Sequence, residues 1–384
     1  MAGNMIDYVK ERGYESWKER PFCEVDSLVL SQFSYLKFDG IVPEVDSRKA
    51  PVGILEISRH ADFEKLFADE RYREVNQGLF DAVKKSRRFG SMKLGLYENI
   101  IDVNKETQFS AVTFFLDDGT IFVAFRGTDE TIVGWKEDFN MAFMKPVIGQ
   151  LISVKYLEHA AQKFDGPFLV GGHSKGGNFA VFSAMKCREE VRERIVKIYS
   201  HDGPGFRPEV LRGGDFEAVE DRICKILPHS SVVGMLLQHQ ENYEVVQCKK
   251  FGLMQHNPFN WLIEDCDFVR VKDVYYGRRL LDEALNEWIL SLPEEQLTLF
   301  VDTLFQIIEA SEADNLIDLA AEWKKSANGV LNAVKEIDGE TKKRLKRILG
   351  RLFAILSHRL KKELTRPEKK HGEHGVHKKM DSFL

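Results

Sequence analysis

The stretch Gly172-His173-Ser174-Lys175-Gly176 constrains the fold of this chain more than any other feature. An apolar run at residues 168–170 precedes it, and small and apolar residues at helical spacing follow it from Gly177 onward. This pattern predicts a buried strand, a sharp turn and a helix packed closely on a sheet. A side chain at position 172 or 176 would collide with the neighbouring strand and helix, so the turn requires very small residues there.

The turn fits the pattern Gly-x-Ser-x-Gly, in which a serine on a strained strand-to-helix turn presents its hydroxyl at the edge of an α/β-hydrolase sheet. The competing interpretation is a glycine-rich phosphate loop. That loop ends in Gly-Lys-Ser/Thr after a four-residue insert, and the sequence has neither feature. We therefore interpret Ser174 as a nucleophile.

The apolar runs around this turn predict a mixed α/β sheet. Beyond the serine strand, strands are expected at residues 94–102, 108–116, 120–126, 194–200, 221–227 and 243–248. Asp117-Asp118-Gly119 predicts a hairpin and hence an antiparallel opening to the sheet. A helix over residues 150–164 then leads to the serine strand. A strand, a helix and a parallel return strand are typical of doubly wound sheets, whose sites form at the carboxyl ends of strands.

The pattern divides the chain into four expected parts. Residues 1–92 are mostly helical and form an N-terminal cover or cap, and residues 93–272 form the α/β-hydrolase core. Residues 273–366 contain no convincing strand and form a helical region, with helices expected at residues 297–308, 317–323 and 341–364. Residues 367–384 are rich in His, Lys, Gly and Glu, so we expect them to be disordered.

The N-terminal residues, the apolar stretches and the cysteines predict a cytoplasmic protein. The N-terminus has no basic start followed by an apolar run, so a secretory signal is not expected. No uncharged apolar stretch is long enough to span a bilayer. The number of cysteines is odd and none form a Cys-x-x-Cys pair, which indicates reduced thiols: Cys23, Cys187, Cys224, Cys248 and Cys266.

A serine hydroxyl is a poor nucleophile at neutral pH, so Ser174 needs a base and a group that orients the base. In α/β-hydrolases the acid and then the histidine follow the serine in the chain. His256 is the best base candidate because it follows the last predicted strand; otherwise it is a surface-loop histidine. Asp202 ends the first strand after the serine, and as an alternative it only forms a turn. Other candidate acids are Glu241, Asp265 and Asp267, and a water or a serine in that place stays open.

The oxyanion of an acyl-transfer intermediate needs two hydrogen-bond donors. One candidate is the backbone N–H of Lys175, the residue after the nucleophile. The other is Thr128, in the loop that leaves the predicted hairpin. As an alternative, Thr128 only caps a helix that begins near residue 132.

Together these motifs resemble the fungal-type class 3 lipases: Val123-Ala124-Phe125-Arg126-Gly127-Thr128-Asp129, then Gly134-Trp135 and Asp138-Phe139, then the serine turn. In that family a Phe-Arg-Gly-Ser/Thr loop supplies the oxyanion residue and Gly-His-Ser-Leu-Gly-Gly carries the nucleophile. The sequence is more similar to a bacterial group of lipase-like proteins of unassigned function, which share residues 202–206, 233–236 and 255–259. The resemblance covers roughly residues 93–262. It implies Ser174 as nucleophile, Thr128 in the oxyanion hole and His256 as base.

Two positions depart from the class 3 pattern. Those lipases place their acid after the strand that corresponds to residues 221–227, where this chain has no carboxylate at residues 228–232. Either Asp202 supplies the acid one strand earlier, or the triad is incomplete. Lys175 replaces the usual leucine, and its cation either favours an acidic substrate or faces solvent.

The sequence therefore predicts a serine ester hydrolase that cleaves a lipid, an acyl-glycerol or another acyl ester, with no metal or organic cofactor. The alternative is a catalytically impaired hydrolase-fold protein that binds an acyl ligand or a protein partner. The missing acid motivates that alternative.

A separate basic segment bears on possible partners. Residues 341–384 carry a net charge of +10, against −5 for the whole chain. The basic amphipathic helix at residues 341–364 either binds an anionic membrane surface, which would make the protein peripheral, or docks on the acidic body of its own chain. Nucleic acid is not expected, because no binding motif or aromatic interleaving accompanies the basic residues.

Overall fold

The computed structural model describes residues 2–70, 72–128, 132–141, 146–237, 242–250, 252–272, 274, 276–310, 335 and 337–364. The predicted helix at residues 317–323, the tail from residue 367 and the candidate acid Glu241 lie outside these ranges.

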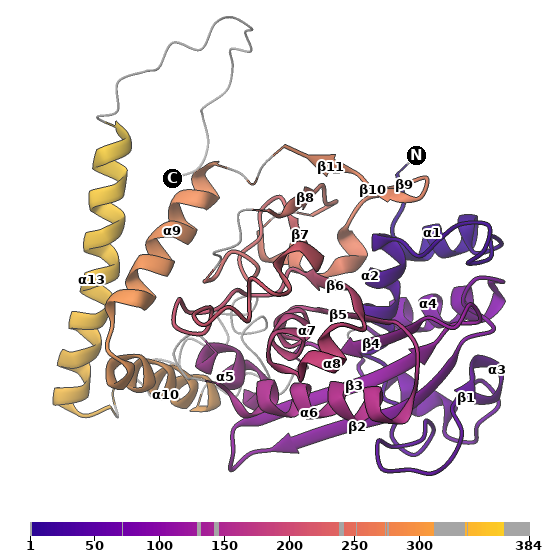
Figure 1. The fold of residues 1–384 in the computed structure, drawn as a ribbon. Coiled ribbons are helices and arrows are strands. Elements are labelled where there is room, and N and C mark those ends of the chain that lie inside the picture. Colours follow the sequence, from indigo (N-terminus) through magenta and orange to yellow (C-terminus); the bar gives the residue numbers. More distant parts are fainter. Residues whose placement is uncertain are drawn as a thin grey trace, which may run out of the picture.

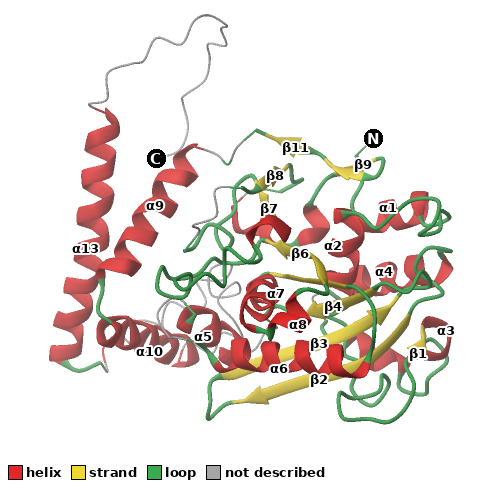
Figure 2. Ribbon diagram, in the orientation of Figure 1, coloured by secondary structure: helices red, strands yellow, loops and turns green. Residues whose placement is uncertain are grey.

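Within the described residues, a nine-stranded sheet has helices on both faces (Figure 1, Figure 2). Its spatial order is β1-β2-β3-β4-β5-β6-β7-β8-β11, and β9 pairs with β10 separately. The strands are β1 Val52–Gly53, β2 Lys93–Asp102, β3 Thr107–Phe115, β4 Ile121–Phe125, β5 Phe168–His173, β6 Ile195–His201, β7 Ile223–Pro228, β8 Glu244–Val246, β9 Ile263–Glu264, β10 Asp267–Phe268 and β11 Arg270–Val271.

The strand directions confirm the predicted α/β-hydrolase fold. Strands β2, β3 and β4 pair antiparallel, and β4 to β8 run parallel. The helices are α1 Met5–Arg12, α2 Glu24–Phe33, α3 Ile54–Ile57, α4 Arg73–Lys85, α5 Ile132–Asn140, α6 Ile148–Lys163, α7 Lys175–Lys186, α8 Glu189–Arg192, α9 Tyr276–Ser291, α10 Glu294–Ala310 and α13 Gly339–Leu364. Helix α6 connects to β5, and α7 follows the serine turn, as the sequence predicts.

Two hydrophobic cores cover the two faces of the sheet. Helices α1, α2 and α4 share one core with strand residues such as Phe114 and Phe122. Helices α6 and α7 share the other core with residues such as Val123 and Phe125. Successive strand residues point to opposite faces, so neighbours on β4 belong to different cores. The N-terminal helices therefore pack on one face of the sheet.

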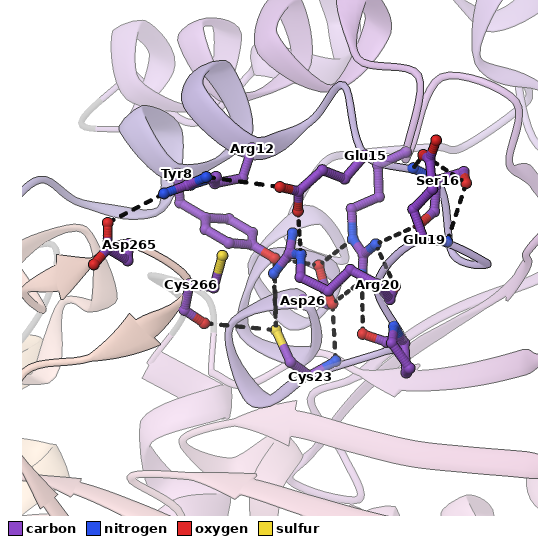
Figure 3. Close-up of polar contacts among 12 residues, drawn as sticks. Tyr8, Arg12, Glu15, Ser16, Glu19, Arg20, Cys23, Asp26, Asp265 and Cys266 are labelled. Carbon is purple, nitrogen blue, oxygen red and sulfur yellow. Dashed lines mark hydrogen bonds and ion pairs between the residues drawn. The ribbon is translucent and has the colours of Figure 1, made fainter.

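A buried ion pair fixes these N-terminal helices in place. Arg88 and Asp26 are fully buried and make two hydrogen bonds, 2.8 Å from Nε and 2.6 Å from Nη2. The Tyr8 hydroxyl donates to Asp26 at 2.7 Å, and Arg12 reaches Asp265 at 3.1 Å (Figure 3). Asp265 lies in the β9–β10 hairpin, so this cluster joins the N-terminal segment to the chain just beyond His256.

The C-terminal helices form a third cluster on the side of the molecule away from α1 and α4 (Figure 1). Helix α13 packs along α9, and the Trp288 indole N–H donates to the carbonyl of Ile348 at 2.9 Å. Helix α10 rests on α5, where the rings of Phe139 and Phe305 meet edge to face at 5.7 Å. None of the helices in the described ranges is long and apolar enough to cross a membrane.

Candidate active site

Three of the predicted site residues, Thr128, Ser174 and Asp202, follow the ends of three adjacent parallel strands. Phe125 at the end of β4 pairs with Gly172 on β5, and His173 at the end of β5 pairs with His201 on β6. The loops that carry Thr128, Ser174 and Asp202 therefore leave the sheet at one edge, as the rule for parallel sheets requires.

The turn at Ser174 is strained, and its glycines are required. Ser174 has φ of 59° and ψ of −130°, a conformation that L-residues rarely adopt. A Cβ on Gly172 would lie 2.3 Å from the carbonyl carbon of Gly176, and a Cβ on Gly176 would lie 2.0 Å from the carbonyl oxygen of Phe125. The close approach of strand and helix thus leaves no room for a side chain at either position.

Ser174, His256 and Asp202 are joined by hydrogen bonds in series. His256 lies in the 3-10 turn Gly252–His256, and its Nε2 is 2.9 Å from the Ser174 hydroxyl oxygen. Its Nδ1 is 2.7 Å from Asp202 Oδ2. The Asp202 carboxylate is fully buried, whereas the His256 side chain is 24% exposed. This arrangement allows the imidazole to accept a proton from the serine while the carboxylate orients the ring.

The segment after β7 supplies donors to the aspartate instead of an acid. The Ser231 hydroxyl donates to Asp202 Oδ1 at 2.5 Å, and the backbone N–H of Gly234 donates to the same oxygen at 3.1 Å. The alternative acids lie elsewhere: Asp265 pairs with Arg12 and Asp267 pairs with Arg270, both at the surface. Among the described carboxylates, Asp202 is the one that contacts His256.

The two candidate oxyanion donors flank Ser174. Lys175 is the first residue of α7, so its backbone N–H has no acceptor within the helix. A Cβ on Gly127 would lie 3.0 Å from the Cβ of Ser174, so the loop leading to Thr128 lies against the serine. The Thr128 hydroxyl donates to Asp138 Oδ2 on α5. The Thr128 side chain is thus bonded to a residue near the end of α5.

The Lys175 side chain does not face solvent, which corrects one of the two sequence interpretations. It is 1% exposed, and its Nζ donates to Glu137 Oε2 at 2.9 Å. Glu137 also accepts from the backbone N–H groups of Gln108 and Gly149, each at 3.0 Å. A buried charge requires this compensation. Glu137 lies in no sequence motif, so its pairing with Lys175 could not be predicted from the sequence.

Asp138 is a second carboxylate close to the serine. Burial raises its pKa to about 6, against the lowering effects of the Lys175 charge and the Thr128 hydrogen bond. Its other oxygen, Oδ1, is 3.9 Å from Lys175 Nζ. The carboxyl group therefore changes its charge state near neutral pH, beside a candidate oxyanion residue.

Two residues outside the predicted set contact this site. His173 Nε2 is 2.8 Å from the carbonyl oxygen of His256, and His173 Nδ1 is 3.0 Å from the Tyr35 hydroxyl. The sequence has no pattern that points to Tyr35 as a neighbour of the site. The described residues include no group of three or more His, Cys, Asp or Glu side chains that could hold a metal ion.

The sheet and the serine turn define a lipase-like α/β-hydrolase fold. The chain belongs to the Mbeg1-like family, whose model matches residues 83–306. This membership agrees with the resemblance seen in the sequence to lipase-like proteins of unassigned function.

Solved structures of lipases also match the chain. M37 lipase is 16% identical over 56% of this chain and 70% of its own, with a TM-score of 0.37. The Lip2 lipase of Yarrowia lipolytica is 13% identical over 50% of this chain and 76% of its own, with a TM-score of 0.33. The lipase of Rhizopus microsporus var. chinensis is 16% identical over 56% and 82%, with a TM-score of 0.31. A search of curated proteins found no match.

Proposed function

We propose that this protein is a serine hydrolase that cleaves an acyl ester through an acyl-enzyme intermediate. The observation that supports this most is the hydrogen-bonded series Ser174–His256–Asp202 on a strained turn. In the proposed reaction, Ser174 Oγ attacks the ester carbonyl carbon while His256 Nε2 takes the hydroxyl proton. His256 then returns the proton to the leaving alkoxide, and a water molecule hydrolyses the acyl-serine by the same steps.

The negative charge on the tetrahedral intermediate would be held by the backbone N–H groups of Lys175 and Thr128, because the Thr128 hydroxyl already donates its proton to Asp138. The buried Lys175–Glu137 pair anchors the first turn of α7 against α5, which keeps the Lys175 N–H in place. Because such donors are fixed before the reaction begins, they stabilise the transition state without reorganisation.

The first test is the variant Ser174→Ala. We expect it to lose turnover of a short-chain nitrophenyl ester by on the order of 10⁴-fold or more, and to lose labelling by a fluorophosphonate. The matched control is Ser183→Ala, since Ser183 is a buried serine of α7 whose hydroxyl donates to the carbonyl of Ala180. That variant should react like the wild type.

Equal turnover by Ser174→Ala and wild type would refute the assignment. A folded wild-type protein that resists the fluorophosphonate would instead favour the alternative of a hydrolase-fold protein that binds an acyl ligand or a partner.

We also propose that α13 binds an anionic lipid surface. One face of this helix is docked on its own chain: Ile348 is buried, and Arg359 pairs with Glu283 and Glu287. The opposite face leaves Phe353 66% exposed and Leu360 51% exposed. Docking on the body and binding a membrane are therefore compatible, since they use different faces.

A further inference from the structure

The Tyr35 hydroxyl lies where three segments of the site meet. Tyr35 follows α2 by two residues, and its oxygen is 3.0 Å from His173 Nδ1. A Cβ on Gly127 would lie 2.1 Å from this oxygen, and the Gly127 backbone is hydrogen-bonded to it. One hydroxyl of the N-terminal segment therefore contacts both the serine turn and the loop that leads to Thr128.

The chemistry of the hydrogen-bond partners determines where the protons of Tyr35 and His173 lie. The carbonyl of His256 only accepts, so His173 Nε2, 2.8 Å away, must carry a hydrogen. Burial, and secondarily the nearby His256, lower the pKa of His173 well below its usual value, so the ring is neutral. Its Nδ1 is then an acceptor. Burial raises the pKa of the Tyr35 phenol, which keeps its proton and donates it to Nδ1.

This series of hydrogen bonds, from Tyr35 through His173, ends on the backbone of His256. The ring of that residue is held by Asp202 at Nδ1, and its carbonyl is held by His173. The two imidazole rings lie 4.6 Å apart between centroids. Fixing a residue at both its backbone and its side chain restricts the ring to one position relative to Ser174.

We propose that Tyr35 and His173 are positioning residues, which set the position of the His256 ring and of the Gly127–Thr128 loop. They act through two hydrogen bonds: the Tyr35 hydroxyl donates to His173 Nδ1, and His173 Nε2–H donates to the His256 carbonyl. This inference rests on the proposed role of His256 as the base. Tyr35 lies outside residues 83–306, the part that the family model matches.

The test is Tyr35→Phe, which removes one oxygen and keeps the ring. The expected result is a kcat for the nitrophenyl ester lower by about 10- to 100-fold with KM changed less than threefold, because a small misplacement of the base slows the chemical step. The matched control is Tyr97→Phe on β2, whose hydroxyl donates to Asp39 at 2.9 Å. It removes the same group from a buried phenol away from Ser174 and should keep the wild-type kcat.

Substitutions of His173 separate positioning from packing. His173→Gln keeps an amide N–H that can reach the His256 carbonyl, so it should retain at least tenfold more activity than His173→Leu. If His173→Leu does not fold, the comparison of Tyr35→Phe with Tyr97→Phe decides alone. Wild-type activity in Tyr35→Phe, or equal losses in both tyrosine variants, would overturn the proposal.

A second measurement does not depend on activity. In Ser174→Ala protein at pH 7, ¹⁵N NMR should find His173 neutral with its proton on Nε2, and Tyr35→Phe in the same background should shift the tautomer balance. A charged ring, or a proton on Nδ1 before the substitution, would overturn the proposal. An inactive wild type with the expected tautomer would refute the proposed hydrolase function while leaving the hydrogen-bond chain in place.

Discussion

Asp138 connects the charge state of the site to the stability of the fold. Its carboxyl group accepts from Thr128 and lies 3.9 Å from Lys175 Nζ, and burial raises its pKa to about 6. The unfolded chain would release that proton near pH 3.9. Between about pH 4 and pH 6 the folded state therefore binds more protons than the unfolded state, so this group makes the protein less stable as pH rises.

Asp138→Asn removes that titration while keeping a hydrogen-bonding group of similar shape. We subtract the free energy of unfolding of the wild type from that of the variant at each pH. This difference should be about 1–3 kcal/mol larger at pH 7 than at pH 4. Urea unfolding at both pH values measures this difference. Asp117→Asn, at an exposed turn, serves as the control. Parallel pH dependence in Asp138→Asn and wild type would show that the carboxyl group does not titrate in this range.

The residues that meet at Ser174 were predictable because each follows a strand end. Ser174 has a local motif, and Asp202 and His256 follow predicted strands, so the rule that parallel strands end at one edge of the sheet brings them together. Tyr35 could not be predicted in this way, since it is 138 residues from His173 and no pattern links them. The burial of Lys175 could not be predicted either, because only the tertiary structure brings its partner Glu137 close.

At the scale of elements, length decides what the sequence reveals. The longer strands contain continuous or alternating apolar runs, which is why β2 to β8 were predicted close to their observed bounds. Strands β1, β9, β10 and β11 contain two residues each, too few to show any period. Helix α13, at 26 residues, shows a clear apolar stripe, but the sequence alone does not say which side of the stripe is covered.

The basic residues of α13 fall into a group that is paired with the rest of the chain and a group that is exposed. Arg344 and Arg359 pair with glutamates of α10 and α9, on the docked side. Lys343, Lys346 and Arg347 are exposed on the same helix as the exposed apolar residues Phe353 and Leu360. A second copy of this helix would place like charges together, so charge favours an anionic surface. Basic residues beside an exposed apolar stripe suit the interface of an anionic bilayer.

The test compares binding to vesicles with and without anionic phospholipid. Replacing Lys343, Lys346 and Arg347 by Gln should weaken binding to anionic vesicles by about 100-fold, since each basic residue contributes about 1 kcal/mol near such a surface. Added salt should have a similar effect. Sedimentation with the vesicles measures both.

The apolar contribution is tested by Phe353→Ser with Leu360→Ser. Its control is Leu151→Ser with Val196→Ser, two residues exposed elsewhere at 47% and 57%. We expect Phe353→Ser with Leu360→Ser to weaken binding to anionic vesicles and the control pair to leave it unchanged. Equal binding to neutral vesicles, or concentration-dependent dimers that the first pair abolishes, would refute a lipid-binding role.

At the scale of the whole molecule, the N-terminal segment and the sheet share one hydrophobic core. Trp17 near the N-terminus and Trp261 beyond His256 belong to the same hydrophobic core. The indole N–H of Trp261 donates to the carbonyl of Gln255, the residue before His256. The N-terminal segment therefore supports the base in two ways, through this core and through Tyr35, so it cannot detach without disturbing the site.

Two neighbouring arginines make this coupling testable. Arg88 is fully buried against Asp26, whereas Arg87 is 64% exposed and pairs with Glu19 at 3.2 Å. Arg88→Gln leaves the Asp26 carboxylate buried without its cation, which should lower the free energy of unfolding by about 3–5 kcal/mol. Arg87→Gln should change it by less than about 1 kcal/mol, because exposed ion pairs contribute little.

Hydrogen exchange detected by mass spectrometry separates a local effect from a global one. In a single folding unit, Arg88→Gln should speed exchange in peptides from α2 and from β5 to a similar extent, because both open in the same unfolding event. Faster exchange in α1 and α2 with β5 unchanged would mean that the N-terminal segment opens by itself. In that case the base could lose the support of Tyr35 while the sheet stays folded, and opening of this segment would act on the site without unfolding the protein.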